Sequence, residues 1–148
     1  MVILNAAPAQ PIPPQVLPLV DLLVVNQHEA AALTGAASPQ DAIPRLLQDV
    51  PAVVVTLGAD GCVYATPTDT AWVPAPQVTV VDTTGAGDTF CGVLAARLAG
   101  GDPIDDALTL ASAAAALSVG RHHAQPSIPT RDAAETLRRQ TYPTPIPR

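Results

Sequence analysis

The sequence contains no lysine, and this absence removes two common ways of binding a nucleotide. All seven basic residues among the 148 are arginines. A P-loop needs the lysine of its GK[ST] sequence, and a protein kinase needs a lysine on a strand. Neither motif can therefore be present. Because the arginines are scattered and the formal net charge is −6, binding to nucleic acid or to an anionic membrane surface is not expected.

Cysteine and long apolar runs are also scarce. Cys62 and Cys91 are the only cysteines, which is too few for a disulfide framework and predicts a reducing, cytoplasmic environment. No apolar run reaches the roughly 18 residues of a membrane span. The opening stretch MVILNAAPAQ lacks the basic start of a signal peptide. Hydrophobic residues make up 48% of the chain and charged residues 14%, which is typical of a globular protein with a buried core.

Short apolar runs alternate with helical patterns along the chain. The clearest strand is AVVVTL, at 52–57. Further strands are predicted at 2–5, 21–25, 62–66, 70–75 and 78–82. Helices are predicted at 28–35, 39–48, 88–101, 103–120 and 132–139, with one helical turn near 14–19. This order predicts an α/β layered fold with a mostly parallel sheet, flanking helices and one hairpin section.

Local signals predict several helix boundaries. Gly35 is expected to end the first helix, and Ser38-Pro39 to begin the second, with serine as the cap and proline at the first helical position. Asp102-Pro103 is expected to begin a later helix in the same way. The proline-rich end TYPTPIPR, residues 141–148, is expected to be a disordered tail behind a body spanning 1–140.

A glycine-rich stretch lies between the predicted strand at 78–82 and the helix expected from Asp88. Gly85 and Gly87 fit two glycine positions of the dinucleotide fingerprint, but Phe90 occupies the third. Glycines allow backbone N–H groups to converge, and a helix N-terminus adds about half a positive charge. The stretch can therefore hold a phosphate group without lysine. Asp88 could take a proton from an incoming hydroxyl or could cap the helix, and the stretch alone leaves both interpretations open.

Further motifs surround this stretch in a fixed order. LNAAPA, VDLLVVNQHEAAALTG, VVVTLGADG, VDTTGAGDTF and AAAALSVGRHHAQPSIPT follow one another through nearly the whole chain. On these motifs the chain resembles the C-terminal half of the ribokinase-like (PfkB) carbohydrate kinases. The resemblance implies a ribokinase-like layered fold without the N-terminal half and the lid. It also implies ATP-dependent phosphorylation of a sugar hydroxyl, with D-ribose to ribose 5-phosphate as the expected reaction, and ATP, Mg²⁺ and K⁺ as the cofactors.

The resemblance also implies roles for individual residues. Asp88 corresponds to the catalytic base. The anion hole corresponds to the three residues Gly85, Ala86 and Gly87. Asn26 and Glu29 match an NxxE motif, whose asparagine contacts nucleotide phosphate and whose glutamate organises Mg²⁺ through water. The remaining cofactor-binding positions are Thr56, Leu57, Gly58, Ala59, Asp60, Gly61 and Ser112, together with Gly87 and Asp88. Without the resemblance, the NxxE residues could simply start a helix, and 56–61 could be a plain hairpin turn.

A monovalent cation site is implied as well, usually for K⁺. The matching residues are Asp82, Thr84, Ser118, Arg121, His123 and Ser127. Oxygen ligands suit a hard, weakly charged cation. The family usually has glycine where this chain has His123, and this departure weakens the case because histidine adopts a positive φ less readily. Zinc is not expected at His122 and His123, because adjacent side chains diverge.

The family's sugar-binding residues lie in a part that this chain does not match. We therefore expect the chain to supply the ATP side of a sugar kinase. The alternative is a non-catalytic nucleotide-binding fragment that needs an N-terminal partner or is inactive alone. An expressed fragment, a truncated gene product and one half of a split enzyme all remain open. Loss of the first half should expose a sheet edge, which predicts a homo-oligomer.

Overall fold

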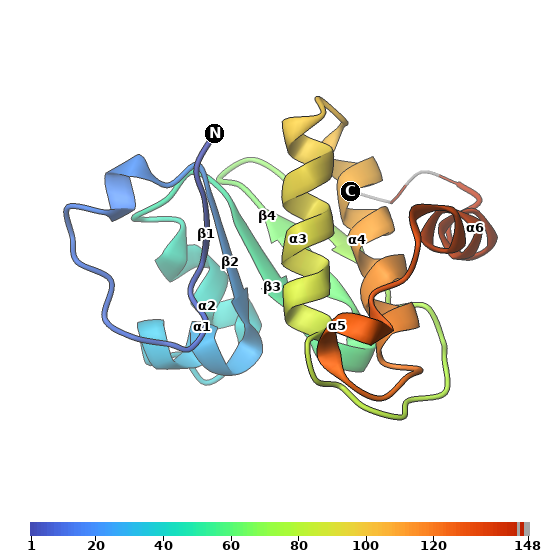
Figure 1. Cartoon of the computed structure of the whole chain (residues 1–148). Coiled ribbons are helices and arrows are strands. Elements are labelled where there is room, and N and C mark those ends of the chain that lie inside the picture. Colours follow the sequence, from blue (N-terminus) through green and yellow to red (C-terminus); the bar gives the residue numbers. More distant parts are fainter. Residues whose placement is uncertain (145, 147–148) are drawn as a thin grey trace. The chain divides into compact units, whose positions relative to one another are not determined.

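The computed structural model describes residues 1–144 and 146, and the chain divides into two compact units (Figure 1). Unit 1 is Met1–Trp72, and unit 2 begins at Val73. In the described part of the chain, no helix combines the length and the apolar character needed to cross a membrane.

A five-stranded sheet with the order β1-β2-β3-β4-β5 organises unit 1. Its strands are β1 Ile3–Asn5, β2 Leu22–Asn26, β3 Val53–Thr56, β4 Cys62–Ala65 and β5 Thr70–Val73. The pairs β1–β2 and β2–β3 are parallel, and β3–β4 is antiparallel. The predicted α/β class, with parallel strands and a hairpin section, is confirmed.

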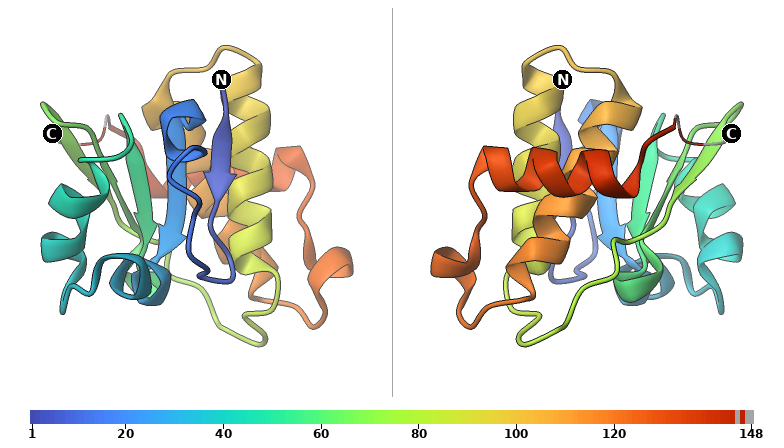
Figure 2. Two further views of the ribbon diagram at one scale, coloured as in Figure 1. Left: turned by 90° about the vertical axis from the view of Figure 1, so that its left-hand side faces the viewer. Right: turned by 90° about the vertical axis from the view of Figure 1, so that its right-hand side faces the viewer.

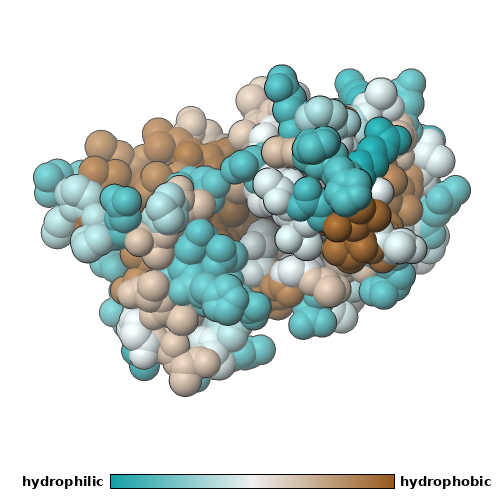
Figure 3. All heavy atoms as spheres, turned by 60° about the horizontal axis from the view of Figure 1, so that its bottom comes forward, coloured by the Kyte–Doolittle hydropathy of each residue, from teal (hydrophilic) through white to brown (hydrophobic). Residues whose placement is uncertain are grey.

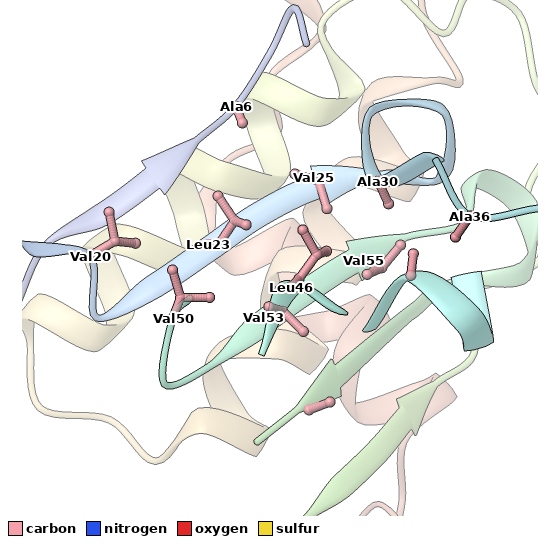
Figure 4. Packing of buried hydrophobic residues seen from close by; sticks show 12 residues of the cluster. Ala6, Val20, Leu23, Val25, Ala30, Ala36, Leu46, Val50, Val53 and Val55 are labelled. Carbon is pink, nitrogen blue, oxygen red and sulfur yellow. The ribbon is translucent and has the colours of Figure 1, made fainter. Parts of the chain in front are cut away.

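Apolar side chains of β2 and β3 form the core of unit 1 (Figure 4). Leu23 is paired with Val53 and Val25 with Val55 in the parallel register. Because alternate residues of a strand share one face, these side chains point together toward the helices. They pack there against Ala30 and Leu46. Burying each such valine or leucine is worth about 1.5–3 kcal/mol. Val24 and Val54, on the opposite face, are buried as well, so both faces of these strands are covered.

The helices of unit 1 begin and end largely where local signals predict. They are α1 Gln27–Thr34 and α2 Pro39–Leu46. Gly35 ends α1 in the left-handed conformation, with φ 68°, and the Ser38 hydroxyl accepts the Asp41 N–H at 3.2 Å. α2 ends at Leu46, slightly before the predicted residue 48. The predicted helical turn is the 3-10 helix η1, Leu17–Leu19.

Unit 2 is helical. Its helices are α3 Ala86–Ala99, α4 Ile104–Ser118, α5 Ala124–Ser127 and α6 Arg131–Thr141. Figure 1 shows α3 and α4 side by side, and the right-hand view of Figure 2 shows α6 lying across α4. Leu110, Ala114 and Ala134 form the small core between α4 and α6. The many alanines of α4 permit this close packing because their side chains are short.

Several predicted boundaries in unit 2 are wrong. Residues 78–82 form no strand, and the backbone N–H groups of Val81 and Asp82 donate to the carbonyl of Val119 instead, at 2.7 and 3.1 Å. α3 begins at Ala86 rather than near residue 88. Pro103, not Asp102, is the N-cap of α4. The Asp102 carboxylate is paired with the guanidinium of Arg97 instead, which links the end of α3 to the connection before α4.

The chain end also differs from the predicted pattern. α6 is longer than the predicted 132–139 and includes Thr141. The Tyr142 hydroxyl donates to the carbonyl of Pro74 at 2.6 Å. The last residues of the expected tail, Pro145, Pro147 and Arg148, lie outside the described residues, and the division into 1–140 and a disordered tail stays a prediction.

Apolar surface is exposed in separate patches, shown in brown for one face in Figure 3. The most exposed large apolar side chains are Met1, Val2, Leu19 and Trp72 in unit 1, and Val80, Val81 and Ile128 in unit 2.

Candidate functional site

Two predicted motifs of unit 1 meet at the carboxyl ends of neighbouring parallel strands. Asn26 ends β2 and is paired in register with Thr56, which ends β3. The NxxE motif and the loop at 56–61 therefore start side by side. The carboxyl ends of parallel strands are the usual place for ligand binding in open α/β sheets.

Asn26 and Glu29 form a capping box at the start of α1. The Asn26 side-chain oxygen accepts the N–H groups of His28 and Glu29, at 2.9 and 2.8 Å. In return, a carboxylate oxygen of the buried Glu29 accepts the Asn26 N–H at 2.7 Å. The local interpretation as a helix start is thus confirmed. Within the described residues, the amide nitrogen of Asn26 and the second carboxylate oxygen of Glu29 have no hydrogen-bond partner.

The loop at 56–61 is a tight turn between the antiparallel strands β3 and β4. It contains the 3-10 helix η2, Gly58–Asp60. The Leu57 N–H donates to the carbonyl of Gly61 at 2.7 Å, and Gly61 has a φ of 97° that favours glycine. The Trp72 indole N–H donates to the carbonyl of Asp60 at 3.0 Å. The plain hairpin-turn interpretation is therefore correct for its backbone, and a nucleotide role stays a prediction.

The glycine-rich stretch of unit 2 forms a turn that leads directly into α3. Gly85 is the N-cap, with φ 79° and no side-chain cap. Its carbonyl accepts the N–H of Thr89 at 2.9 Å. Within residues 1–144 and 146, no backbone carbonyl accepts the N–H of Gly87 or Asp88. Two donors at the positive end of a helix therefore remain open for an anion.

Asp88 lies in the first turn of α3 and is exposed. The capping interpretation of this residue is wrong, because Gly85 holds the cap position and no side chain caps the helix. Asp88 belongs to the same helical turn as the open donors, and its role as a base stays a prediction.

Asp82 connects the glycine turn with a distant segment. One carboxylate oxygen accepts the Thr84 N–H at 2.9 Å. The other accepts the His123 N–H at 3.2 Å, across 41 residues of sequence. The pKa of Asp82 is lowered from 3.8 to about 2, chiefly by the hydrogen bond from the Thr84 side chain, then by the backbone N–H groups of Thr84 and His123. These hydrogen bonds favour the charged form of the carboxylate.

The other predicted cation residues only partly gather around Asp82. Thr84 and His123 contact it directly. The hydroxyls of Ser118 and Ser127 donate to helix carbonyls, those of Ala115 and Ala124, at 2.8 and 2.7 Å. The Arg121 N–H donates to the carbonyl of Ser118 at 3.3 Å. The structure's described residues contain no cluster of three or more His, Cys, Asp or Glu suited to a metal ion.

Ser112, predicted to lie beside an adenine, is buried in the middle of α4. Sequence reasoning missed Ala124, the first residue of α5. A Cβ atom placed on Gly85 would lie 2.9 Å from the Ala124 Cβ, so the two backbones are in close contact. No sequence signal marks this contact, because it joins residues of two separate segments.

The parallel sheet with polar groups at its carboxyl edge and the open helix N-terminus are typical of α/β proteins that bind phosphate-bearing ligands. Residues 1–131 match the family model described as pfkB family carbohydrate kinase. The chain therefore belongs to the pfkB family of carbohydrate kinases.

Individual relatives agree with this assignment. The ribokinase of Bacillus subtilis is 39% identical over 137 residues, which are 92% of this chain and 45% of the relative. A crystal structure of ribokinase from Thermotoga maritima matches with a TM-score of 0.87 and 36% identity, over 93% of this chain and 48% of the other. Arabidopsis thaliana ribokinase, solved with ribose and ATP, also has a TM-score of 0.87, at 33% identity over 93% of this chain and 47% of the other. The ribokinase-like fold is thus confirmed, and the chain spans about half the length of these relatives.

Proposed function

We propose that this chain supplies the phosphate-binding and proton-accepting side of an ATP-dependent sugar kinase, with D-ribose to ribose 5-phosphate as the reaction. The observation that carries the proposal is the pair of open N–H groups of Gly87 and Asp88, with the exposed Asp88 in the same helical turn. The relative solved with ribose and ATP supports the choice of substrates.

We propose that residues of both predicted motifs bind a nucleotide with its magnesium ion. In the proposal, the N–H groups of Gly87 and Asp88 hold the oxygens of the phosphoryl group, and the Asp88 carboxylate accepts the proton of the sugar hydroxyl. Bound ATP would supply the phosphoryl group, and Mg²⁺ would neutralise part of its charge. The amide nitrogen of Asn26 is assigned to nucleotide phosphate and the carboxylate of Glu29 to the water shell of Mg²⁺. The loop at 56–61 and Ser112 complete the proposed nucleotide contacts.

A potassium ion is part of the proposal. Its assigned ligands are mostly backbone carbonyls, with the side chains of Asp82 and one serine. They come from Asp82, Thr84, Ser118, Arg121, His123 and Ser127. The carboxylate of Asp82 supports this assignment, because a hard cation prefers charged oxygen ligands.

We assign the free edge of β1 to pairing with a partner chain. β1 is an edge strand. The backbone groups of Ile3 and Asn5 point away from β2, because alternate residues of β1 pair with β2. We propose that this edge pairs with an N-terminal half or with a second copy of the chain. Light scattering should then show a homo-oligomer of the chain alone, and a monomer at high concentration would contradict the pairing of two copies.

A base substitution tests the catalytic role. The wild-type chain, Asp88→Asn and the control Asp132→Asn are compared for ATP binding by calorimetry with Mg²⁺ and for ribose-dependent ADP release. We expect Asp88→Asn to lower turnover by roughly 10²–10⁴-fold, with ATP affinity retained. Asp132 is exposed in α6, and its variant should behave like the wild type. Unchanged turnover in Asp88→Asn would eliminate the base.

The same measurements test the alternative function, a nucleotide-binding fragment that needs an N-terminal partner. The match covers only 45% of the Bacillus subtilis relative. This favours the alternative, because a hydroxyl without a pocket has no geometry for attack. ATP binding without ribose-dependent turnover would support this alternative. Absence of ATP binding would contradict both functions.

A further inference from the structure

Two distant segments of unit 2 are joined next to the start of α3. The N–H groups of Val81 and Asp82 donate to the carbonyl of Val119, just after α4. The His123 N–H then donates to the Asp82 carboxylate. In Figure 1 the two segments run together below α3 and α4. The chain before the glycine turn is therefore fixed to the chain between α4 and α5.

Asp82 is the only side chain in the described hydrogen bonds that connects these segments. Its two carboxylate oxygens serve different partners, Thr84 N–H within the glycine turn and His123 N–H outside it. Hydrogen bonds to a charged acceptor are about twice as strong as neutral ones. One carboxylate thus holds both the turn and the neighbouring segment.

The contact between Gly85 and Ala124 lies beside this connection. Gly85 is required for two reasons, its φ of 79° and the lack of space for a Cβ next to Ala124. Ala124 follows His123 directly, so the hydrogen bond from His123 determines where Ala124 lies. A shift of this segment would change the packing on Gly85, the residue that caps α3.

We propose that Asp82 is a positioning residue, which presents the open N–H groups of Gly87 and Asp88 to a phosphate group by holding residues 122–124 against the glycine turn. This inference rests on the proposed function, because it concerns the same phosphate-binding turn. The role is separate from that of an ion ligand, since the connection consists of direct hydrogen bonds. Donors bind an anion well only when they are held in place beforehand.

Asp82→Asn tests the proposal. Asparagine keeps one oxygen to accept the Thr84 N–H, but its NH₂ group cannot accept the N–H of His123. ATP affinity is measured with Mg²⁺ in a potassium-free buffer and again with potassium chloride, for the wild type, Asp82→Asn and the control Asp132→Asn. We expect the Kd for ATP to rise roughly tenfold in Asp82→Asn in both buffers, and to stay within about twofold in the control.

Two results would overturn the proposal. One is an unchanged ATP affinity in Asp82→Asn. The other is a loss of affinity only when potassium is present, which would make Asp82 an ion ligand alone. Ala124→Gly serves as a second variant, because it keeps Asp82 and removes only the methyl group beside Gly85. A smaller loss of ATP affinity is expected for it.

Amide hydrogen exchange separates positioning from general stability. In Asp82→Asn, the hydrogen-bonded amides of Ala86, Thr89 and His123 should exchange faster, while Leu110 in the core of unit 2 keeps its rate. If the wild type does not bind ATP, the proposed function is refuted. The positioning role of Asp82 is then tested by the hydrogen-exchange rates only. Equal rates at Ala86 and Thr89 in the wild type and the variant would refute it, and a uniform increase that includes Leu110 would show a merely structural role.

Discussion

His123 has a backbone conformation that histidine rarely adopts, so glycine at this position should stabilise the protein. Its φ is 73° and its ψ 151°, a region populated almost only by glycine, where other residues cost on the order of 1–3 kcal/mol. Glycine also increases the conformational entropy of the unfolded chain, which lowers the free energy of unfolding by roughly 0.4–1 kcal/mol. We therefore expect His123→Gly to raise the free energy of unfolding by about 0.5–2 kcal/mol.

The neighbouring histidine provides a matched control. Among the described non-glycine residues, His123 alone has a positive φ, so His122→Gly gains no relief of strain. It should lower stability by roughly 0.4–1 kcal/mol. Both variants keep their backbone N–H, so the hydrogen bond from residue 123 to Asp82 is preserved. Urea unfolding followed by circular dichroism measures the difference. If His123→Gly is no more stable than His122→Gly, the strain argument is refuted.

Four further predictions concern other local features. Because the pKa of Asp82 lies at about 2 in the folded chain and near 3.8 otherwise, its stabilisation is complete above about pH 4 and is lost as the pH falls toward 2; the stability difference between the wild type and Asp82→Asn should therefore shrink over this range in urea titrations. Asn26→Ala removes the capping box and should cost about 0.5–2 kcal/mol by the same assay; an unchanged midpoint would contradict the capping role. Gly85→Ala should cost roughly 1–3 kcal/mol, and Ala124→Gly in the same chain should recover part of this loss, because the 2.9 Å contact is removed while the 3.2 Å contact with the Cα of residue 124 and the positive φ remain; a double variant no more stable than Gly85→Ala would show that the Ala124 methyl group causes none of the loss. The Thr89 hydroxyl is buried with no partner in the described part of the chain, so Thr89→Val should leave thermal stability equal or raise it by about 1 kcal/mol, and a clear loss would reveal a hidden partner.

Features that depend on neighbouring residues were predictable from the sequence. The Ser38-Pro39 helix start and the Gly35 helix end need only contacts within one or two turns. The runs of valine in β2 and β3 indicated buried strands because only a covered sheet tolerates them. The order of the motifs was sufficient to indicate the family, which the match to residues 1–131 confirms.

The candidate site was predictable only in part. The sequence identified the glycine turn and Asp88, because a strand-like run, glycines and a helix follow one another locally. It left open whether Asp88 caps the helix, since that depends on the exact residue where α3 starts. It gave no indication of the contact between Gly85 and Ala124, whose partners belong to different segments.

The sequence by itself determined the α/β class, the absence of lysine-dependent phosphate motifs and the lysine-free glycine turn. Only the tertiary structure decided that residues 78–82 are not a strand. Their pattern suits a strand, but backbone N–H groups pair with whatever acceptor lies nearby, and here that is the carbonyl of Val119 at the end of α4. The same association of distant segments brings His123 to Asp82 across 41 residues. A pattern of side chains specifies local conformation, whereas the partner of a long-range hydrogen bond exists only once the chain has folded.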